Sequence, residues 1–159
     1  MKKAFLFVML LWVGPLDAAA QDLAPEDAVG ATVKSFFDAL REKDEEGIRN
    51  ALAPGARLMG IRTVEGRPTL QTTDFEDFIP RVVGSEARMD ERNWDVQIEV
   101  KGDLANVWQR FNMFINGELS HCGTEVIHLF RFPEGWKILH LSETLTSEGC
   151  EAENTPGQG

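Results

Sequence analysis

Two histidines in the C-terminal third of the sequence are the residues best suited to chemistry. His128 and His140 flank the turn sequence Pro133-Glu134-Gly135, and pairing about that turn makes them cross-strand neighbours. Two adjacent imidazoles could bind a metal ion, or one could contact a ligand or act as acid or base near neutral pH. The third alternative is that both rings only line a pocket.

A metal site would need a third protein ligand beside the two histidines. The other polar side chains predicted to share their face are Cys122, Gln109, Thr124, Ser142 and Thr144. The same registers turn the strand carboxylates to the opposite face, namely Asp95, Glu99, Glu125 and Glu143. We therefore assign no catalytic residue, no metal and no cofactor.

Three hairpins position these side chains. The segment Trp94 to Val100 alternates apolar and polar residues, as in a half-buried strand. Turns follow at 101–103, at Asn116-Gly117 and at 133–135, of which Asn116-Gly117 is the strongest hairpin signal. Their registers place Trp94 opposite Phe111, and Phe111 opposite Cys122. Because a one-residue slip would turn a strand's apolar residues outward, three agreeing turns predict a curved antiparallel sheet with one inner face.

The predicted inner face has an aromatic lining with a few polar side chains. Such a surface suits a flat, moderately polar organic ligand, and the alternative is an ordinary packed core. The predicted ligand-binding residues are Trp94, Gln109, Phe111, His128, Phe130, Trp136 and His140.

The opposite face of the predicted sheet carries large apolar residues where a solvated sheet would be polar. An exposed patch of this kind usually marks an interface. The residues predicted to form a homodimer interface are Trp108, Ile127, Leu129, Leu139 and Leu141.

Residues 1–20 have the pattern of an export signal: two lysines, an apolar stretch from Ala4 to Val13, and the small residues Ala18 to Ala20. We therefore expect a periplasmic or secreted protein. There, the two cysteines of the mature chain, Cys122 and Cys150, are expected to form one disulfide. A net charge of −10 argues against nucleic acid as a partner and against binding to anionic membranes after signal removal.

One domain is expected over residues 21–148, followed by a disordered polar tail, 149–159, that carries Cys150. Apolar residues at helical spacing predict a helix from Pro25 to about Arg41, a short one after Asp44, and a third after the capping box at Thr73. A small hairpin is predicted around Glu65-Gly66, and residues 84–92 read as irregular. This order of elements predicts an α+β cone, in which a strongly curved mixed or antiparallel sheet wraps around three helices.

Several segments resemble the nuclear transport factor 2-like superfamily, and most closely its branch of exported bacterial proteins labelled putative lumazine-binding. They lie within about residues 24–150 and are Phe36-Phe37-Asp38-Ala39-Leu40 with Lys43-Asp44, Phe75-Glu76-Asp77-Phe78, Ser120-His121-Cys122-Gly123, Gly135-Trp136-Lys137-Ile138 and Gly149-Cys150. The resemblance implies the cone fold and a dimer formed through the outer surface of the sheet. It leaves the function open, because this scaffold hosts isomerases, dehydratases, cyclases, ligand-binding proteins and non-catalytic partners.

The resulting expectation is an exported protein that binds a small organic molecule in an aromatic inner pocket with no clear catalytic machinery. One alternative is an isomerase-like or dehydratase-like enzyme that uses His128 or His140. Against it, the chain has no tyrosine and no inward strand carboxylate in the predicted register, so the usual base and oxyanion donors are missing. The second alternative is a non-catalytic dimerisation or interaction module.

Overall fold

The computed structural model describes residues 23–150, so the predicted signal segment and residues 151–159 of the predicted tail lie outside the described residues. None of the helices in this part of the chain is long and apolar enough to cross a membrane. The elements are α1 Pro25–Glu42, α2 Glu45–Ala51, β1 Leu52–Val64, β2 Arg67–Asp74, α3 Phe75–Val83, β3 Met89–Lys101, β4 Leu104–Ile115, β5 Glu118–Phe132 and β6 Gly135–Leu145.

Helix α1 begins and ends at the signals that the sequence supplies. Pro25 occupies the first turn beside two acidic residues, where a missing N–H costs nothing and negative charge suits the helix dipole. The helix ends because Lys43 adopts a left-handed conformation, with φ of 57°. Its buried stripe, which includes Val29, Val33 and Phe36, faces the sheet.

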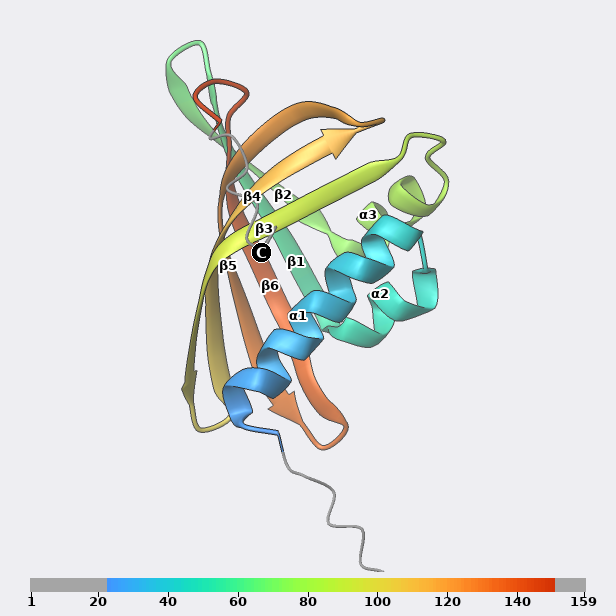
Figure 1. Cartoon of the computed structure of the whole chain (residues 1–159), viewed down its shortest axis with the longest axis vertical. Coiled ribbons are helices and arrows are strands. Elements are labelled where there is room, and N and C mark those ends of the chain that lie inside the picture. Colours follow the sequence, from blue (N-terminus) through green and yellow to red (C-terminus); the bar gives the residue numbers. More distant parts are fainter. Residues whose placement is uncertain (1–22, 151–159) are drawn as a thin grey trace, which may run out of the picture.

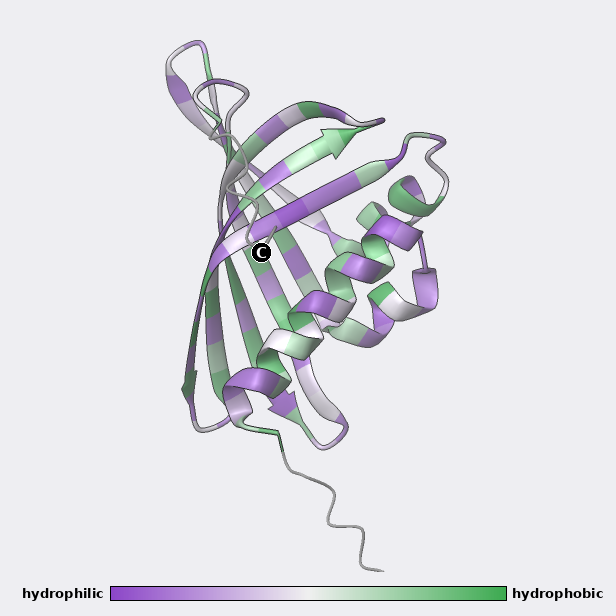
Figure 2. Cartoon of the chain, in the orientation of Figure 1, coloured by the Kyte–Doolittle hydropathy of each residue, from purple (hydrophilic) through white to green (hydrophobic). Residues whose placement is uncertain are grey.

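The six strands of the described chain form one open sheet in the order β2-β1-β6-β5-β4-β3. Only β1 and β6 pair in parallel; the other neighbours are antiparallel. Figure 1 shows α1 crossing one face of the strongly curved sheet, with α2 and α3 beside its C-terminal end. We call this the inner face. The predicted α+β cone is confirmed, and the apolar and polar residues alternate along its strands (Figure 2).

Strand β3 is longer than the sequence indicates, because it begins at Met89 within the segment predicted to be irregular. The long β4–β5 hairpin provides its partners: Met89 pairs with Ile115, and the Asn116 backbone N–H donates to the Arg88 carbonyl over 2.8 Å. This pairing orders the polar residues 89–92, which carry little strand propensity of their own. It also places Glu91 in the sheet.

A β-bulge makes the register of the Asn116-Gly117 hairpin differ from the predicted one. Next to the turn, Ile115 pairs with Glu118 as a two-residue turn requires, but the register shifts between Met113 and Phe114. Phe111 therefore pairs with Gly123 and not with Cys122. Because one extra residue reverses the side-chain alternation, the predicted faces of the rest of β5 are interchanged.

Two further bulges change which side chains face the helices. In β3 the register shifts after Trp94, where Asp95 has a positive φ of 54°, and Trp94 pairs with Arg110 in place of Phe111. In β6 the predicted pair His128 and His140 is confirmed, and the register then shifts. This shift keeps the buried Trp136 and Ile138 on the inner face with Leu141.

A disulfide joins Cys122 and Cys150, as predicted, with their Cα atoms 5.7 Å apart. Cys122 and Thr146 exchange two backbone hydrogen bonds, of 2.8 and 3.0 Å. Gly149, at φ of 68°, then lets the chain turn back toward β5. Beside the disulfide, Gly123 is the residue that fits, because a Cβ there would collide with the Thr144 carbonyl oxygen.

Removing the disulfide should destabilise the fold without changing its register. The Cys122→Ala/Cys150→Ala double variant should lose about 3 kcal/mol of unfolding free energy, because the cross-link restricts the unfolded chain over a long loop. Urea unfolding of the exported protein measures the loss. Two free thiols in the non-reduced wild type would contradict the bridge.

Candidate functional site

The structure divides the predicted ligand-binding residues between the two faces of the sheet. Gln109, Phe111 and Trp136 lie on the inner face, where Phe111 and Trp136 are packed in the interior. Trp94, His128, Phe130 and His140 lie on the outer face because of the bulges. The prediction that all seven residues line one pocket is therefore wrong, although three of them face the helices.

The histidine pair is real but lies away from the helices. The rings of His128 and His140 have centroids 4.3 Å apart, and both residues alternate with the buried Ile127, Leu129 and Leu141. Burial, and then the neighbouring His140, lowers the pKa of His128. No group of three His, Cys, Asp or Glu side chains within residues 23–150 is arranged to hold a metal ion. The pair cannot serve a pocket on the inner face.

The predicted dimer patch is also divided. Ile127, Leu129 and Leu141 belong to the hydrophobic core and are at most 3% exposed, so they cannot form an interface. Leu139 is half-buried in the irregular part of β6. Trp108 does lie outside, with half of its surface exposed, and Phe130 joins it on that face.

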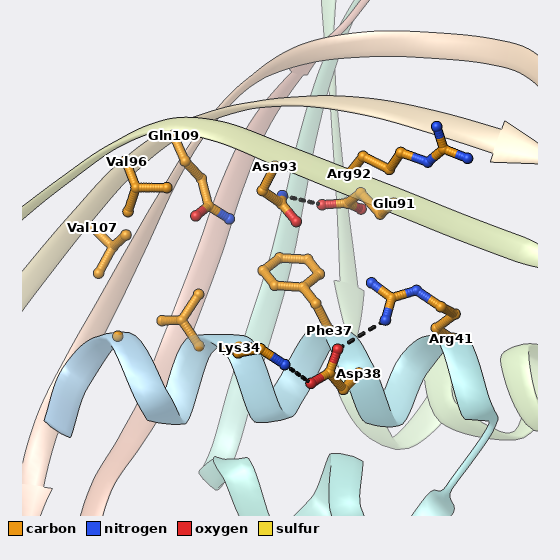
Figure 3. Close-up of a pocket in the computed structure, with 12 residues that line it drawn as sticks. Lys34, Phe37, Asp38, Arg41, Glu91, Arg92, Asn93, Val96, Val107 and Gln109 are labelled. Atoms are coloured by element: carbon orange, nitrogen blue, oxygen red, sulfur yellow. Dashed lines mark hydrogen bonds and ion pairs between the residues drawn. The ribbon is translucent and has the colours of Figure 1, made fainter. Parts of the chain in front are cut away.

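A cleft of about 380 Å³ opens between α1 and the strands β3 and β4. Its apolar walls come from Val33 and Phe37 on the helix and from Val96 and Val107 on the strands. Figure 3 shows the Phe37 ring rising from α1 toward the polar side chains of the strands. The strand side of the cleft carries Glu91, Asn93 and Gln109.

The carboxyl groups of Glu91 and Glu125 are connected at the strand side of the cleft. The Asn93 Nδ2 atom donates to Glu91 Oε1 over 2.8 Å and to Glu125 Oε1 over 3.0 Å, so one amide connects both carboxyl groups. Gln109 Nε2 also donates to Glu125 Oε1, over 2.5 Å. Glu125 is 1% exposed, and its second oxygen, Oε2, receives no hydrogen bond from any N–H donor of the described residues. Glu91 itself lines the cleft.

A third glutamate continues the row across the sheet. Glu125 pairs with Glu143 on β6, which in turn pairs with Gly60 on β1. Glu143 borders a second cleft, of about 300 Å³, together with Arg62 and residues of α3. The inner face therefore carries a line of carboxyl groups between two hollows.

Burial makes these carboxyl groups weak acids. It raises the pKa of Glu91 to about 8, to which the charge of Glu143 contributes. Burial raises the pKa of Glu143 to about 7, against the pull of Arg62. Burial and the charge of Glu91 raise the pKa of Glu125 well above its usual value. Glu91 is therefore largely protonated at neutral pH, and it can give up this proton at the cleft.

An ion-pair ladder on α1 forms the rim of the cleft. Asp38 contacts Lys34 and accepts from Arg41 Nη1 over 2.8 Å (Figure 3). Arg41 Nε also donates to Asp90 over 2.9 Å. The hydrogen bonds from Lys34 and then Arg41 lower the pKa of Asp38. Arg41 is therefore already engaged by two aspartates at the rim.

Sequence reasoning missed this site for two local reasons. Glu91 fell in a segment interpreted as a loop, and Glu125 was assigned to the outer face by the unshifted register. One available signal is the two-residue spacing of Glu125, Ile127 and Leu129, which places the glutamate on the same face of β5 as two strongly apolar residues.

The fold and the cleft define a cone-shaped α+β protein of the nuclear transport factor 2-like type, with a scaffold for small-molecule binding. The family model described as "Putative lumazine-binding" matches residues 24–141, and the chain belongs to that family. No curated protein matches the sequence.

Solved structures share the fold at low sequence identity. A putative dehydratase of the NTF2-like family from Streptomyces avermitilis is 18% identical with a TM-score of 0.61, covering 76% of this chain and 95% of its own. A putative ketosteroid isomerase from Shewanella frigidimarina is 20% identical with a TM-score of 0.56, covering 76% of this chain and 97% of its own. An NTF2-like protein from Cytophaga hutchinsonii is 17% identical with a TM-score of 0.61, covering 76% and 97%. These likenesses confirm the fold.

Replacing Glu91 should change how stability depends on pH. Because its pKa in the folded chain, about 8, lies above the usual 4.5, its contribution to stability is complete below pH 4.5 and is lost as the pH rises to about 8. Glu91→Gln cannot ionise, and should be more stable than wild type at pH 8 by about 1–3 kcal/mol but not at pH 4.5. Urea unfolding at both pH values measures this. The exposed Glu99→Gln on the same strand is the control, and parallel pH curves for wild type and Glu91→Gln would refute the assignment.

Proposed function

We propose that this protein is exported and binds a small organic molecule, without covalent chemistry, in the cleft between α1 and strands β3 and β4. The observation that carries the proposal is the pairing of apolar walls with a buried carboxyl, Glu125, that keeps one oxygen without a donor. A cleft of about 380 Å³ suits a molecule of one or two rings.

Two features support export to the periplasm or the medium. Residues 1–20 carry the pattern of a secretory signal. The bond between Cys122 and Cys150 belongs in an oxidising compartment, where such bonds persist.

A second candidate function is proton transfer on a bound substrate, as in an isomerase or a dehydratase. The favouring observation is that Glu91 lines the cleft with a pKa of about 8, and that Asn93 connects it to Glu125, whose pKa burial also raises; carboxyl groups with raised pKa values in a cleft are candidates for proton transfer. In this proposal the chemistry belongs to Glu91 and Glu125, and the two histidines take no part. Turnover that Glu91→Gln abolishes, with ligand binding retained, would favour the enzyme over the binding protein.

Blocking the cleft should abolish ligand capture. Val96 is half exposed at the cleft, so Val96→Trp should fill it while the fold persists. Native mass spectrometry of protein purified from the periplasm should find a small molecule on the wild type and lose it, by at least about tenfold, in the variant. Val64→Trp, equally exposed on the β1–β2 hairpin, is the matched control. Retention by Val96→Trp, or capture by neither protein, would count against the cleft.

We also propose that the outer face of the sheet forms a homodimer, through a patch different from the one predicted. Trp108 on β4 and Phe130 on β5 are 51% and 40% exposed, and the neighbouring rings of His128 on β5 and His140 on β6 lie on the same face. A charge at the centre of such a patch should yield monomers, so Trp108→Glu is expected to raise the dimer dissociation constant by at least about a hundredfold. Sedimentation measures it, with the exposed Leu23→Glu as control. A wild type that is monomeric at high micromolar concentration would refute the dimer.

A further inference from the structure

The neutral amides of Asn93 and Gln109 donate hydrogen bonds to the carboxyl groups on the inner side of the cleft. Glu91 and Glu125 share one amide donor, Asn93 Nδ2, and Glu143 lies next along the row. The nearest basic group on the helix, Arg41, is hydrogen-bonded to Asp38 and Asp90 at the rim. The site is therefore rich in hydrogen-bond acceptors, and a ligand that brings N–H donors would complement it.

The buried oxygen of Glu125 is an independent sign that something is missing from this site. Glu125 is 1% exposed, yet its Oε2 has no donor among the N–H groups of the described chain. A buried acceptor without a partner is costly and rare in folded proteins. Its two amide partners, Asn93 and Gln109, line the cleft itself, so the deficit lies directly behind the ligand-binding surface.

The opposite wall supplies an aromatic ring. Phe37 projects from α1 toward Asn93 and Glu91, and Val96 and Val107 complete the apolar surface (Figure 3). A flat molecule can lie against this ring, and a delocalised positive charge is attracted to an aromatic face. The Phe37 ring and the carboxyl group of Glu91 therefore favour the same kind of ligand, a flat molecule with a positive charge and N–H donors.

We propose that the cleft selects a flat organic cation of the amidinium or amino-heterocycle class, which lies against Phe37 and donates its N–H groups to Glu91. This inference rests on the proposed ligand-binding function of the cleft. Glu125 acts behind Glu91 as a positioning residue, through the Asn93 amide from which both carboxyl groups accept a hydrogen bond. An anionic ligand would place its charge against the carboxyl group of Glu91, so it should bind more weakly than a cation of the same shape.

Binding then displaces a proton. In the free protein the Glu91 carboxyl is largely protonated at neutral pH, and pairing with a cation requires its carboxylate, so its O–H bond breaks and the proton passes to solvent. The charged groups that face the site from α1, β3, β5, β6 and β1 are Lys34, Asp38, Arg41, Asp90, Arg92, Glu125, Glu143 and Arg62. Because binding a cation requires the ionised carboxylate of Glu91, whose pKa is about 8, affinity should rise with pH up to about 8, by at most about tenfold per pH unit.

Three probes of one shape test the proposal: benzamidine, a planar cation; benzamide, its neutral analogue; and benzoate, the matched anion. Isothermal titration of the exported protein at pH 7 should show benzamidine binding at least about tenfold tighter than benzamide, and no binding of benzoate. Repeating the benzamidine titration in phosphate and in Tris should give different heats, because a proton is released to the buffer. Equal heats, or equal affinity for benzamidine and benzamide, would overturn the proposal.

Variants distinguish a failure of the cation inference from a failure of the proposed ligand-binding function. Glu91→Gln should bind benzamidine about tenfold more weakly than the wild type does, and without proton release. Its affinity for benzamide should equal that of the wild type. Glu99→Gln, exposed on the same strand, should bind all three probes as the wild type does. Suppose that benzamide or benzoate binds at least as tightly as benzamidine, and that Val96→Trp abolishes this binding. That result would refute the inference that the cleft selects a cation and would leave the proposed ligand-binding function intact. Failure of every probe would also refute the inference, and the retained molecule in native mass spectrometry would then decide the function.

Discussion

The placement of three register shifts in the β3–β6 meander is the constraint on which the rest of the structure depends. A strand has only two faces, so each shift reverses every side chain beyond it. The shift in β4–β5 alone brings Glu125, Ile127 and Leu129 to the helices and sends His128 and Phe130 outward. The same shifts bend the strands, which gives the sheet the curvature that leaves room for a cleft under α1.

The inner face that results is an unusual core. Its apolar part is ordinary: Phe36, Val107, Ile127 and Ile138 pack between the sheet and the helices. Into this environment the register also brings Glu125, whose burial is partly offset by the amides of Asn93 and Gln109. Both amides donate to the same oxygen of Glu125, Oε1, so the other oxygen, Oε2, has no hydrogen-bond partner among the described residues. An incomplete polar group beside an apolar hollow is what distinguishes a binding surface from simple packing.

The outer face and the C-terminal end follow from the same registers. Once Ile127, Leu129 and Leu141 are in the core, the exposed aromatic side chains on β4 and β5 are Trp108 and Phe130. The pairing of Cys122 with Thr146 continues the β5–β6 register beyond the named strands, so the disulfide fastens the chain at the end of the meander. The two neighbouring histidines lie on this outer surface, away from the cleft under α1.

The sequence by itself determined the order of elements, the fold class, the three turns, the paired histidines and the disulfide, because each depends on local signals: helix periodicity, turn residues and residue type. It did not determine which face each strand presents. A bulge adds one residue without any mark in composition, and Ser120 and Leu139 look like any other strand residues. Nor could it show that the polar segment at Glu91 joins the sheet, since that depends on partners in β4. Only tertiary packing against α1 decided that the acids, and not the histidines, face the cleft, because burying Ile127 and Leu129 outweighs the cost of burying Glu125 beside two amide donors.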